Sequence, residues 1–424
     1  MKILVLNSGS SSQKSCLYEL GAALPDTPPA PLWEAKIEWG ENGAALKVRT
    51  SSGKTSEQRL DKSERSEAIA QLLKALVSGE TRVLTQLSEI DVVGHRVVNG
   101  GRDYTTPTLI TPAVTAAIEK MSAFAPLHNR AELEGMGQIE KRCGSVRQVA
   151  VFDTGFHRTL PEEAAVYPGP YDWVERGIRK FGFHGINHQY CAGRAAQLLK
   201  RNLADLKLVT CHLGNGCSLA AIRGGVSIDT TMGFTPLDGL MMGTRSGSVD
   251  PGILTYLLRQ DRLDAKTLDD LLNAKSGLVG ISGVSGDMRE VEAAMKKESA
   301  RAKLAFDIFV HRLRSGIGSM IAALNGIDAL VFTAGIGENS AEVRAATCAN
   351  LGFLGLFIDA DKNLSSPVES DISAASSAVR VLVLAAQEDW AIARECWKLA
   401  RNALGDERRG LEASPLPGCG LERS

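Results

Sequence analysis

The chain has 424 residues, 44% of them hydrophobic, so it can bury a sizeable core and is too long for one ordinary domain. Its 48 basic and 49 acidic side chains nearly cancel, which argues against a surface for nucleic acid or an anionic membrane. Eight cysteines without a CxxC pair argue against a disulfide scaffold and a zinc site, and no apolar run suits a signal peptide or membrane span. We therefore expect a cytoplasmic protein with reduced thiols.

Apolar runs that alternate with helical segments predict an α/β fold with largely parallel or mixed sheets. The first run, residues 3–6, leads into an Asn-Ser-Gly turn, and residues 67–77 have helical spacing. Residues 25–31 and 41–62 are expected to form exposed connections or edge hairpins. Further strands are predicted at residues 90–93, 149–152, 207–211, 329–332 and 379–384. Ligands in open α/β sheets bind beyond the carboxyl ends of strands, so the segments that follow these runs are candidates for a site.

Three segments rich in glycine, asparagine or serine follow such apolar runs. They are NSGSSS from Asn7, with Lys14 close behind, HLGNG from His212 and GIGEN from Gly335. Backbone amides and hydroxyls in such turns can cradle phosphate, although no Walker A loop is present. Each segment alone is as readily an ordinary turn, but the three together favour a nucleotide held across a cleft. The strand-to-turn segments near residues 7 and 213 also resemble each other, which suggests a duplicated architecture with chance similarity as the alternative.

Several cationic side chains stand among apolar residues and glycines. Arg96 lies in VGHRVV, Arg245 in MGTRSG, His128 in APLHN and His184 in FGFHG. Such neighbours favour a closed site over a solvated face. One such histidine alone is more often a core residue, and one such arginine a salt-bridge partner. Together they suit the electrostatic stabilisation of a transferring phosphoryl group.

Two acids follow predicted strands and are candidates for a magnesium site. Asp153 ends VAVFD and Glu388 follows VLVLAAQ, and Mg²⁺ is commonly held by one or two carboxylates together with substrate phosphates. The alternative for each is a helix cap or a surface acid. Asp287 and Arg289, in SGDMR, could grip an adenosine or cap a helix.

These segments, taken in order, resemble the acetate kinase family over nearly the whole chain. The matching strings are NSGSSS, VGHRVV, APLHN, VFDTGFH, FGFHG, HLGNG, MGFTPLDGLMMGTRSG, SGLVGISGVSGDMR, VFTAGIGEN and AAQED. The resemblance implies the duplicated two-domain α/β fold of actin, sugar kinases and heat-shock chaperone ATPases, with a nucleotide cleft between the domains. We expect one domain from residues 1–153 plus 389–424, completed by the C-terminal helix, and a nucleotide-binding domain from 154–388.

The same resemblance implies reversible, ATP-dependent phosphorylation of acetate to acetyl phosphate, with Mg²⁺ or Mn²⁺, in a homodimer. The residues that it marks as catalytic are Asp153, His184 and Arg245. It marks Asn7 and Glu388 as metal ligands. For the carboxylate and its acyl group it marks Arg96, Val98, Leu127, His128, Phe183 and Pro236. For the nucleotide it marks Lys14, His212, Leu213, Gly214, Asn215, Gly216, Asp287, Met288, Arg289, Gly335, Ile336, Gly337, Glu338 and Asn339.

A small carboxylate is already ionised at neutral pH and needs no general base. We therefore expect direct in-line transfer, with Asp153 acting through the metal and alignment. The chain departs from the family pattern at Asn99, Arg130, Ile186 with Asn187, Ser248, and Asp389 with Trp390. Propionate kinase is the nearest alternative, because one methylene is worth only about 1–3 kcal/mol in an apolar pocket. An actin-like or chaperone-type ATPase is the alternative from another class.

Overall fold

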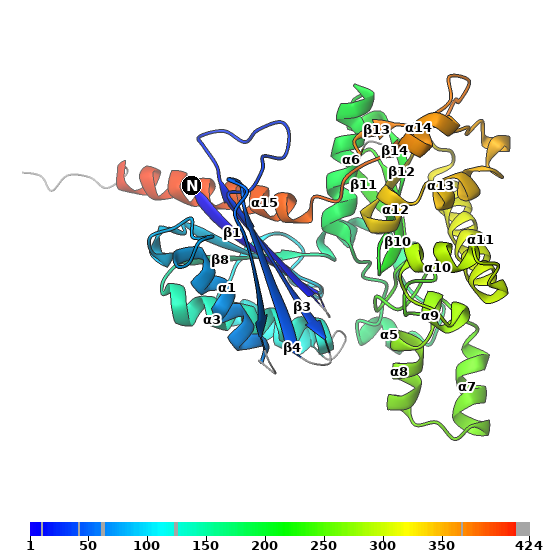
Figure 1. Ribbon diagram of the computed structural model, residues 1–424, viewed down its shortest axis with the longest axis horizontal. Coiled ribbons are helices and arrows are strands. Elements are labelled where there is room, and N and C mark those ends of the chain that lie inside the picture. Colours follow the sequence, from blue (N-terminus) through cyan, green and yellow to red (C-terminus); the bar gives the residue numbers. More distant parts are fainter. Residues whose placement is uncertain (10–11, 41–42, 61–63, 123–125, 366–367, 413–424) are drawn as a thin grey trace, which may run out of the picture.

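The structure, a computed structural model, describes residues 1–9, 12–40, 43–60, 64–122, 126–365 and 368–412, without the side chains of residues 126–128 and 403–412. Two mixed β-sheets form the centres of two halves that lie side by side (Figure 1). Within the described residues, no helix combines the length and the apolar character needed to cross a membrane.

The first sheet has eight strands in the order β5-β4-β3-β2-β1-β6-β8-β7. Strand β1 pairs antiparallel with β2 and parallel with β6, and β6 pairs parallel with β8. The strands are β1 (Lys2–Ser8), β2 (Ser12–Glu19), β3 (Trp33–Gly40), β4 (Gly43–Thr50), β5 (Thr55–Leu60), β6 (Val92–Val97), β7 (Thr108–Leu109) and β8 (Arg147–Phe152).

The second sheet has six strands in the order β11-β10-β9-β12-β14-β13. Strand β9 pairs antiparallel with β10 and parallel with β12, and β12 pairs parallel with β14, so β11-β10-β9-β12-β14 repeats the order and directions of β3-β2-β1-β6-β8. The duplication that the sequence left open is therefore present in the topology. The strands are β9 (Lys207–Leu213), β10 (Cys217–Arg223), β11 (Val226–Thr230), β12 (Ala329–Thr333), β13 (Ser370–Asp371) and β14 (Arg380–Val383).

Helices cover both sheets and connect their parallel strands (Figure 1). Four short 3₁₀ segments occur at Leu87–Glu89, Gly155–Thr159, Leu203–Asp205 and Gly352–Leu354. The α-helices are α1 (Arg65–Val77), α2 (Pro112–Met121), α3 (Pro126–Cys143), α4 (Glu162–Ala165), α5 (Asp172–Glu175), α6 (Gly185–Leu199), α7 (Pro251–Gln260), α8 (Ala265–Ala274), α9 (Gly277–Ser282), α10 (Met288–Met295), α11 (Ala300–Leu324), α12 (Ala334–Asn339), α13 (Ala341–Cys348), α14 (Ala360–Ser365) and α15 (Glu388–Glu412).

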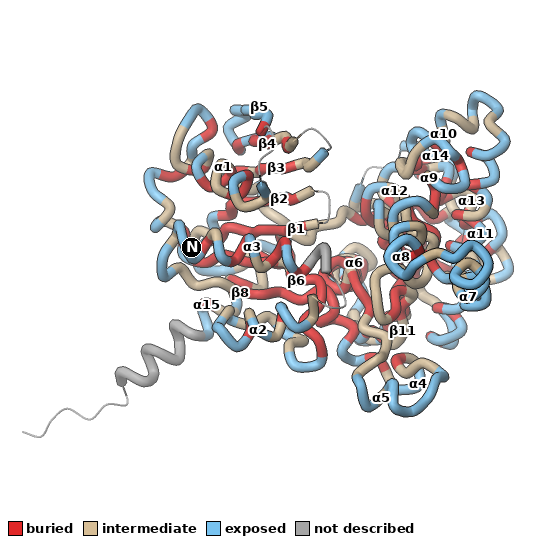
Figure 2. The backbone as a smooth tube through the Cα atoms, turned by 90° about the horizontal axis from the view of Figure 1, so that it is seen from below, coloured by how far each residue is buried: buried red, intermediate tan, exposed pale blue. Residues whose placement is uncertain are grey.

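Helix α1 shows how the sequence pattern becomes packing. Its apolar residues Ile69, Leu72, Leu73 and Leu76 recur at helical spacing, and all four are fully buried against the first sheet. Figure 2 shows the same contrast along the chain, with buried strands in the centre and exposed helix faces outside. The predicted helix at residues 67–77 is confirmed.

A buried cluster joins the two halves through α6 and α15. It includes Ile186 and Tyr190 of α6, Trp390 and Ile392 of α15, and residues of both sheets. Helix α15 crosses the first sheet so closely that a Cβ built on Gly94 of β6 would lie 2.6 Å from Cys396 Sγ and 2.7 Å from Ile392 Cγ2. Glycine at this position is what allows the close approach, and the approach fixes the start of α15 at the edge of the site.

The predicted strands are confirmed to within a few residues, and residues 41–62 contain β4 and the edge strand β5. Two details differ. Arg96 lies inside β6 and not after it, and residues 335–339 belong to α12 and not to an open turn. The domain division at residues 153 and 388 stays a prediction.

Candidate active site

Arg96 and Asp153 form a buried ion pair at the carboxyl ends of the parallel strands β6 and β8. Arg96 Nη2 lies 2.5 Å and Nε 3.2 Å from Asp153 Oδ2, and the Asp153 carboxylate is fully buried. The other carboxylate oxygen, Oδ1, has no hydrogen-bond partner. Burial raises the pKa of Asp153, although the positive charge of Arg96 opposes this shift. Burial acts to lower the pKa of Arg96, but the carboxylates of Asp153 and Glu388 outweigh it and raise that pKa. The arginine therefore stays charged, and Oδ1 remains available to a cation or a polar ligand.

Two further carboxylates contact Asn7 at the end of β1. The Asn7 Nδ2 amide lies 3.1 Å from Glu388 Oε2 and 2.9 Å from Asp389 Oδ1, both in the first turn of α15. Burial acts to raise the pKa of Glu388, but Arg96 and His212 outweigh it and lower that pKa overall. The predicted pair Asn7 and Glu388 is thus brought together, with Asp389 beside it.

Lys14 lies in register with Asn7 across the β1–β2 hairpin, and its side chain is exposed. Lys14 lines a cavity of about 920 Å³, together with Asp389 and residues of β2 to β5. Its charge contributes to lowering the pKa of Glu388. The lysine is therefore close enough to influence the carboxylates electrostatically.

His184 and His212 stack with their ring centroids 3.9 Å apart and their planes inclined by 11°. Two positive charges at this separation would repel by about 4 kcal/mol at an effective dielectric of 20. Burial lowers the pKa of both rings, that of His212 to about 4 and that of His184 well below its ordinary value. Both imidazoles are therefore neutral at pH 7, and each carries a single ring N–H.

The glycine loop at residues 214–216 lies beside these imidazoles. A Cβ built on Gly216 would be 3.3 Å from His184 Nε2 and 3.5 Å from Arg245 Nη1, and one on Gly214 would be 3.8 Å from His212 Nε2. Arg245 is anchored by its Nη1 bond of 3.2 Å to the carbonyl of Pro236. Glycine keeps the loop open to a ligand there, and two imidazole edges and a guanidinium face it.

His184 itself has a left-handed backbone, with φ of 56° and ψ of 21°, at the residue before α6. A non-glycine residue in this region carries a strain of about 1–3 kcal/mol. The amide N–H of Gly185 donates to the Asp153 carbonyl at 2.9 Å, which fixes the turn against the end of β8. The strained turn therefore holds the imidazole at the boundary between the two halves.

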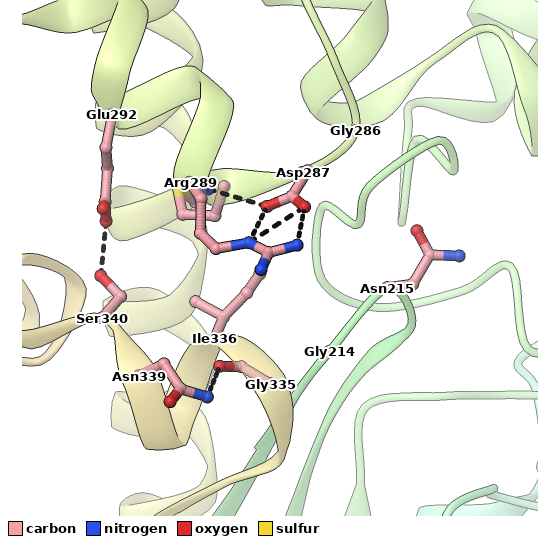
Figure 3. A pocket seen from close by; sticks show the side chains of 11 residues that line it. Gly214, Asn215, Gly286, Asp287, Arg289, Glu292, Gly335, Ile336, Asn339 and Ser340 are labelled. Carbon is pink, nitrogen blue, oxygen red and sulfur yellow. Dashed lines mark hydrogen bonds and ion pairs between the residues drawn. The ribbon is translucent and has the colours of Figure 1, made fainter. Parts of the chain in front are cut away.

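A cavity of about 510 Å³ opens on the other side of the glycine loop, between α10 and α12 (Figure 3). Asp287 caps α10 by accepting from the Arg289 amide, and its carboxylate also holds the Arg289 guanidinium, with Nη2 2.5 Å from Oδ2. Asn339 Nδ2 donates to the Gly335 carbonyl at 2.8 Å. The predicted nucleotide residues that line this cavity are Gly214, Asn215, Asp287, Met288, Arg289, Gly335, Ile336 and Asn339.

Four predicted nucleotide residues, Lys14, His212, Leu213 and Gly216, are absent from the lining of that cavity, and so are Gly337 and Glu338. The carbonyls of Gly337 and Glu338 accept from the buried Arg344 Nη1, and Glu338 Oε1 accepts from the Ala386 amide at 2.8 Å. Leu213 is fully buried in the core. Leu213, Gly337 and Glu338 support the walls of the site in place of lining the cavity.

The predicted acyl pocket is only partly described. Val98 and Phe183 are both buried in one apolar cluster, and Pro236 is tied to Arg245. Leu127 and His128 lie in α3, but their side chains fall outside the described part of the chain. Behind Val98 lies Glu132, whose Oε1 accepts from the Val98 amide at 3.1 Å while Oε2 has no partner. Burial raises the pKa of Glu132 to about 8 although Arg96 opposes the shift.

Several residues of the site escaped the sequence reasoning. Asn187, His188 and Ser218 contact the stacked imidazoles, Glu132 supports Val98, and Gly286, Glu292 and Ser340 complete the lining of the smaller cavity. Asn187 was noted only as a departure from a pattern. Ser340 could have been found from its position as a helix N-cap. The sequence around the other residues of this set gives no indication of their contacts.

The donor set suits Mg²⁺, although among the described residues there is no group of three or more His, Cys, Asp or Glu side chains that could hold a metal. The oxygens near Asn7 come from Glu388 and Asp389, and the buried Asp153 Oδ1 lacks a partner. Mg²⁺ commonly takes one or two carboxylates and completes its shell with water and substrate phosphates. A two-carboxylate site of this kind fits the residues present.

Comparison with known proteins assigns nearly the whole chain to one family. The model of the acetokinase family matches residues 2–394. The chain is 60% identical over 405 residues to the acetate kinase of Gloeobacter violaceus, covering 95% of this chain and 100% of that one. It is 58% identical over 402 residues to the acetate kinase of Trichormus variabilis, covering 94% and 99%.

Two solved structures have the same fold. The acetate kinase of Porphyromonas gingivalis matches with a TM-score of 0.86 at 39% identity, and a propionate kinase from Francisella tularensis with 0.85 at 37%. In both comparisons the match covers 94% of this chain and 99% of the other.

Proposed function

The chain belongs to the acetokinase family, and from that premise we propose that it transfers the γ-phosphoryl group of ATP to acetate, reversibly, forming acetyl phosphate and ADP. The observation that carries the proposal is the buried Arg96–Asp153 pair. A guanidinium held in this way, together with the buried apolar side chains of Val98 and Phe183, suits a carboxylate with a short acyl chain. The stacked imidazoles and the glycine loop can supply hydrogen-bond donors to the phosphate.

The principal barrier is electrostatic, because donor and acceptor are both anions. Two unit charges 4 Å apart repel by about 4 kcal/mol at an effective dielectric of 20. Arg96 neutralises the acceptor, and Arg245 faces the glycine loop where phosphate oxygens would lie. Arginine suits both positions, since its planar fork binds carboxylate or phosphate through two bonds and stays charged.

His184 and Arg245 are proposed to stabilise the transition state. Phosphoryl transfer places charge on the equatorial oxygens, and the protein contributes mainly positioning and electrostatic stabilisation. His184 Nε2 and Arg245 Nη1 approach the same side of Gly216, so both can donate to one phosphoryl group. The acceptor carboxylate needs no deprotonation, so transfer is in line and direct, without a phosphorylated enzyme residue.

Asn7 and Glu388 are proposed to hold Mg²⁺, with Mn²⁺ as a substitute. When bound, the ion would supply positive charge that offsets the negative charge of the substrate phosphates. Asp153 acts through its charge: one carboxylate oxygen contacts the Arg96 fork, and the unpartnered Oδ1 would be available to accept a hydrogen bond from a ligand. It is an organising residue and not a proton carrier.

The adenosine is proposed to occupy the cavity of Figure 3. Its volume of about 510 Å³ lies in the usual range for small-molecule sites. Asp287 and Arg289 are at one wall and Ile336 at the other, which suits a ribose and a flat base. The division into domains of residues 1–153 plus 389–424 and 154–388 is proposed from the two repeated sheets, since it assigns one sheet to each domain.

A homodimer is proposed from the surface around α7. This helix has no buried residue, although it carries Ile253, Tyr256 and Leu258, all exposed. An amphipathic helix that leaves its apolar face open suits an interface between two copies. The seven cysteines described are free thiols, which is consistent with a reducing cytoplasm.

Propionate remains the second candidate acceptor, because a relative of nearly equal structural similarity is a propionate kinase. The test is a hydroxylamine trap with ATP, Mg²⁺ and carboxylates from formate to butyrate. We expect most acyl hydroxamate with acetate and less with propionate. A maximum at propionate would reassign the substrate. Absence of hydroxamate with every acid, together with acetate-independent ADP release, would favour a simple ATPase.

A further inference from the structure

The stacked imidazoles are each held on the side away from the glycine loop by a buried polar side chain. His212 Nδ1 lies 2.9 Å from Asn187 Nδ2, and His184 Nδ1 lies 2.9 Å from Ser218 Oγ. Their Nε2 atoms are the ones near Gly214 and Gly216. Because a neutral imidazole carries only one N–H, the partner at Nδ1 decides whether Nε2 presents a donor or a lone pair.

The surroundings of Asn187 determine which end of its amide faces His212. Its Oδ1 lies 3.7 Å from the Cys191 thiol, which is a donor, and its Nδ2 lies near both His212 Nδ1 and Thr333 Oγ1. The amide therefore donates to Nδ1, and the single ring proton of His212 must be on Nε2. Asn187 and Cys191 are fully buried, so water does not compete for these bonds.

A longer chain of hydrogen bonds ends at His184. Ser218 Oγ lies between His184 Nδ1 at 2.9 Å and His188 Nε2 at 2.8 Å, and His188 Nδ1 lies 2.7 Å from Thr210 Oγ1. One hydroxyl hydrogen can be donated to only one ring, so the directions along the chain are linked. If Thr210 donates to His188, then His188 donates to Ser218 and Ser218 donates to His184, which leaves the His184 proton on Nε2.

We propose that Asn187 and Ser218 are positioning residues that hold His212 and His184 as the tautomers whose Nε2–H groups face the glycine loop. Two neutral rings then present parallel donors to the phosphoryl oxygens. The opposite tautomers would point lone pairs at an anion. The benefit to catalysis rests on the proposed phosphoryl transfer, whereas the tautomers are a property of the folded chain alone.

The test begins with wild-type protein labelled with ¹⁵N at histidine. Long-range ¹H–¹⁵N correlation spectra, assigned with the variants His184→Gln and His212→Gln, distinguish a protonated from an unprotonated Nδ1 in each ring. We expect Nδ1 to be unprotonated in both rings at pH 7 with ATP analogue and Mg²⁺ bound. A protonated Nδ1 in either ring overturns the proposal for that ring, whatever the activity.

Variants then link the tautomer to rate. Asn187→Asp replaces the donor with an acceptor and should move a proton to His212 Nδ1. Asn187→Leu and Ser218→Ala remove the donor and should lower kcat roughly tenfold, less than the 10²–10³-fold loss when such a donor is deleted outright. KM for acetate should stay within about twofold, since the carboxylate is held by Arg96. An unchanged Nδ1 in Asn187→Asp, or unchanged kcat in both folded truncations, overturns the proposal.

Ser227→Ala provides a matched control. Ser227 Oγ lies 2.8 Å from His157 Nδ1, and both residues are buried, but this pair belongs to β11 and the 3₁₀ segment after β8. Its kcat should equal that of wild type. An equal loss of kcat in Ser227→Ala and Ser218→Ala would mean that losing any buried serine bond disturbs the enzyme, which contradicts the proposal. Wild-type protein without acyl hydroxamate but with the expected tautomers would instead contradict the function.

Discussion

Replacement of Arg96 by lysine separates charge from geometry at the carboxylate site. Lysine keeps one positive charge for the buried Asp153 but lacks the planar fork whose Nε and Nη2 both contact Oδ2. Alanine is a poorer test, because a buried charge left without its partner costs about 3–5 kcal/mol in stability. The lysine variant should therefore fold, with a modest loss of melting temperature, while binding of the acceptor weakens.

The expected magnitude follows from the bonds that are lost. A hydrogen bond to a charged group is worth about 1.5–3 kcal/mol. Arg96→Lys removes one such hydrogen bond to the carboxylate of the acceptor. At 1.4 kcal/mol per tenfold change, kcat/KM for acetate should fall roughly 10- to 100-fold. The cavity that we propose for adenosine is lined by α10, α12 and the glycine loop, none of which contains Arg96. KM for ATP should stay within about twofold.

The assay is initial-rate kinetics by hydroxamate formation, with each substrate varied at saturating levels of the other. Circular dichroism and thermal unfolding establish that the variant is folded. Lys47→Arg, at an exposed residue of β4, is a control for charge-conserving exchange. If a folded Arg96→Lys raises KM for ATP as much as KM for acetate, or changes neither, Arg96 does not hold the carboxylate.

Three further predictions concern other parts of the site. Asn7→Ala removes the amide between Glu388 and Asp389 and should raise the Mg²⁺ concentration for half-maximal activity at least roughly tenfold, measured by titration at fixed ATP. Gly243→Ala would put a Cβ 2.3 Å from Asn215 Oδ1 and should raise KM for ATP more than KM for acetate. Burial raises the pKa of Glu132 from 4.5 to about 8, so the native state holds a proton that the unfolded state loses, and stability falls as pH rises across that window. The melting temperature of Glu132→Gln relative to wild type should therefore increase from pH 5 to pH 8, and a constant difference would contradict the shift.

The parts of the site that follow from local sequence were predictable. Arg96, Asp153 and the glycine loop all lie at the ends of apolar runs, and parallel strands bring such ends to one edge of a sheet. The cavity between α10 and α12 was likewise anticipated through Asp287 and Gly335. These predictions needed only the spacing of apolar residues along each predicted strand or helix and the residue at which that apolar run ends.

The contacts around the imidazoles could not be predicted in this way. Ser218 contacts His184 and His188 for two reasons. The register between β10 and β9 sets the position of Ser218, and the packing of α6 against the same sheet brings the two histidines to it. A shift of one residue would turn Ser218 to the other face. Glu132 reaches Val98 only through the packing of α3 against β6. Such pairings are set by tertiary structure, and the sequence around each residue carries no sign of them.

The repeated topology places comparable chain segments at the end of each sheet. Each half offers a hairpin loop and two parallel strand ends, but the side chains there have diverged. The first sheet carries Asn7, Arg96 and Asp153, which suit a cation and a carboxylate, while the second carries His212 and the glycine loop, which suit phosphate. Glu388 begins the helix that returns from the second sheet to the first, and its pKa responds to both Arg96 and His212. We therefore propose that Arg96 and Asp153 on the first sheet hold the acceptor, while His212 and the glycine loop on the second sheet hold the phosphate of the donor.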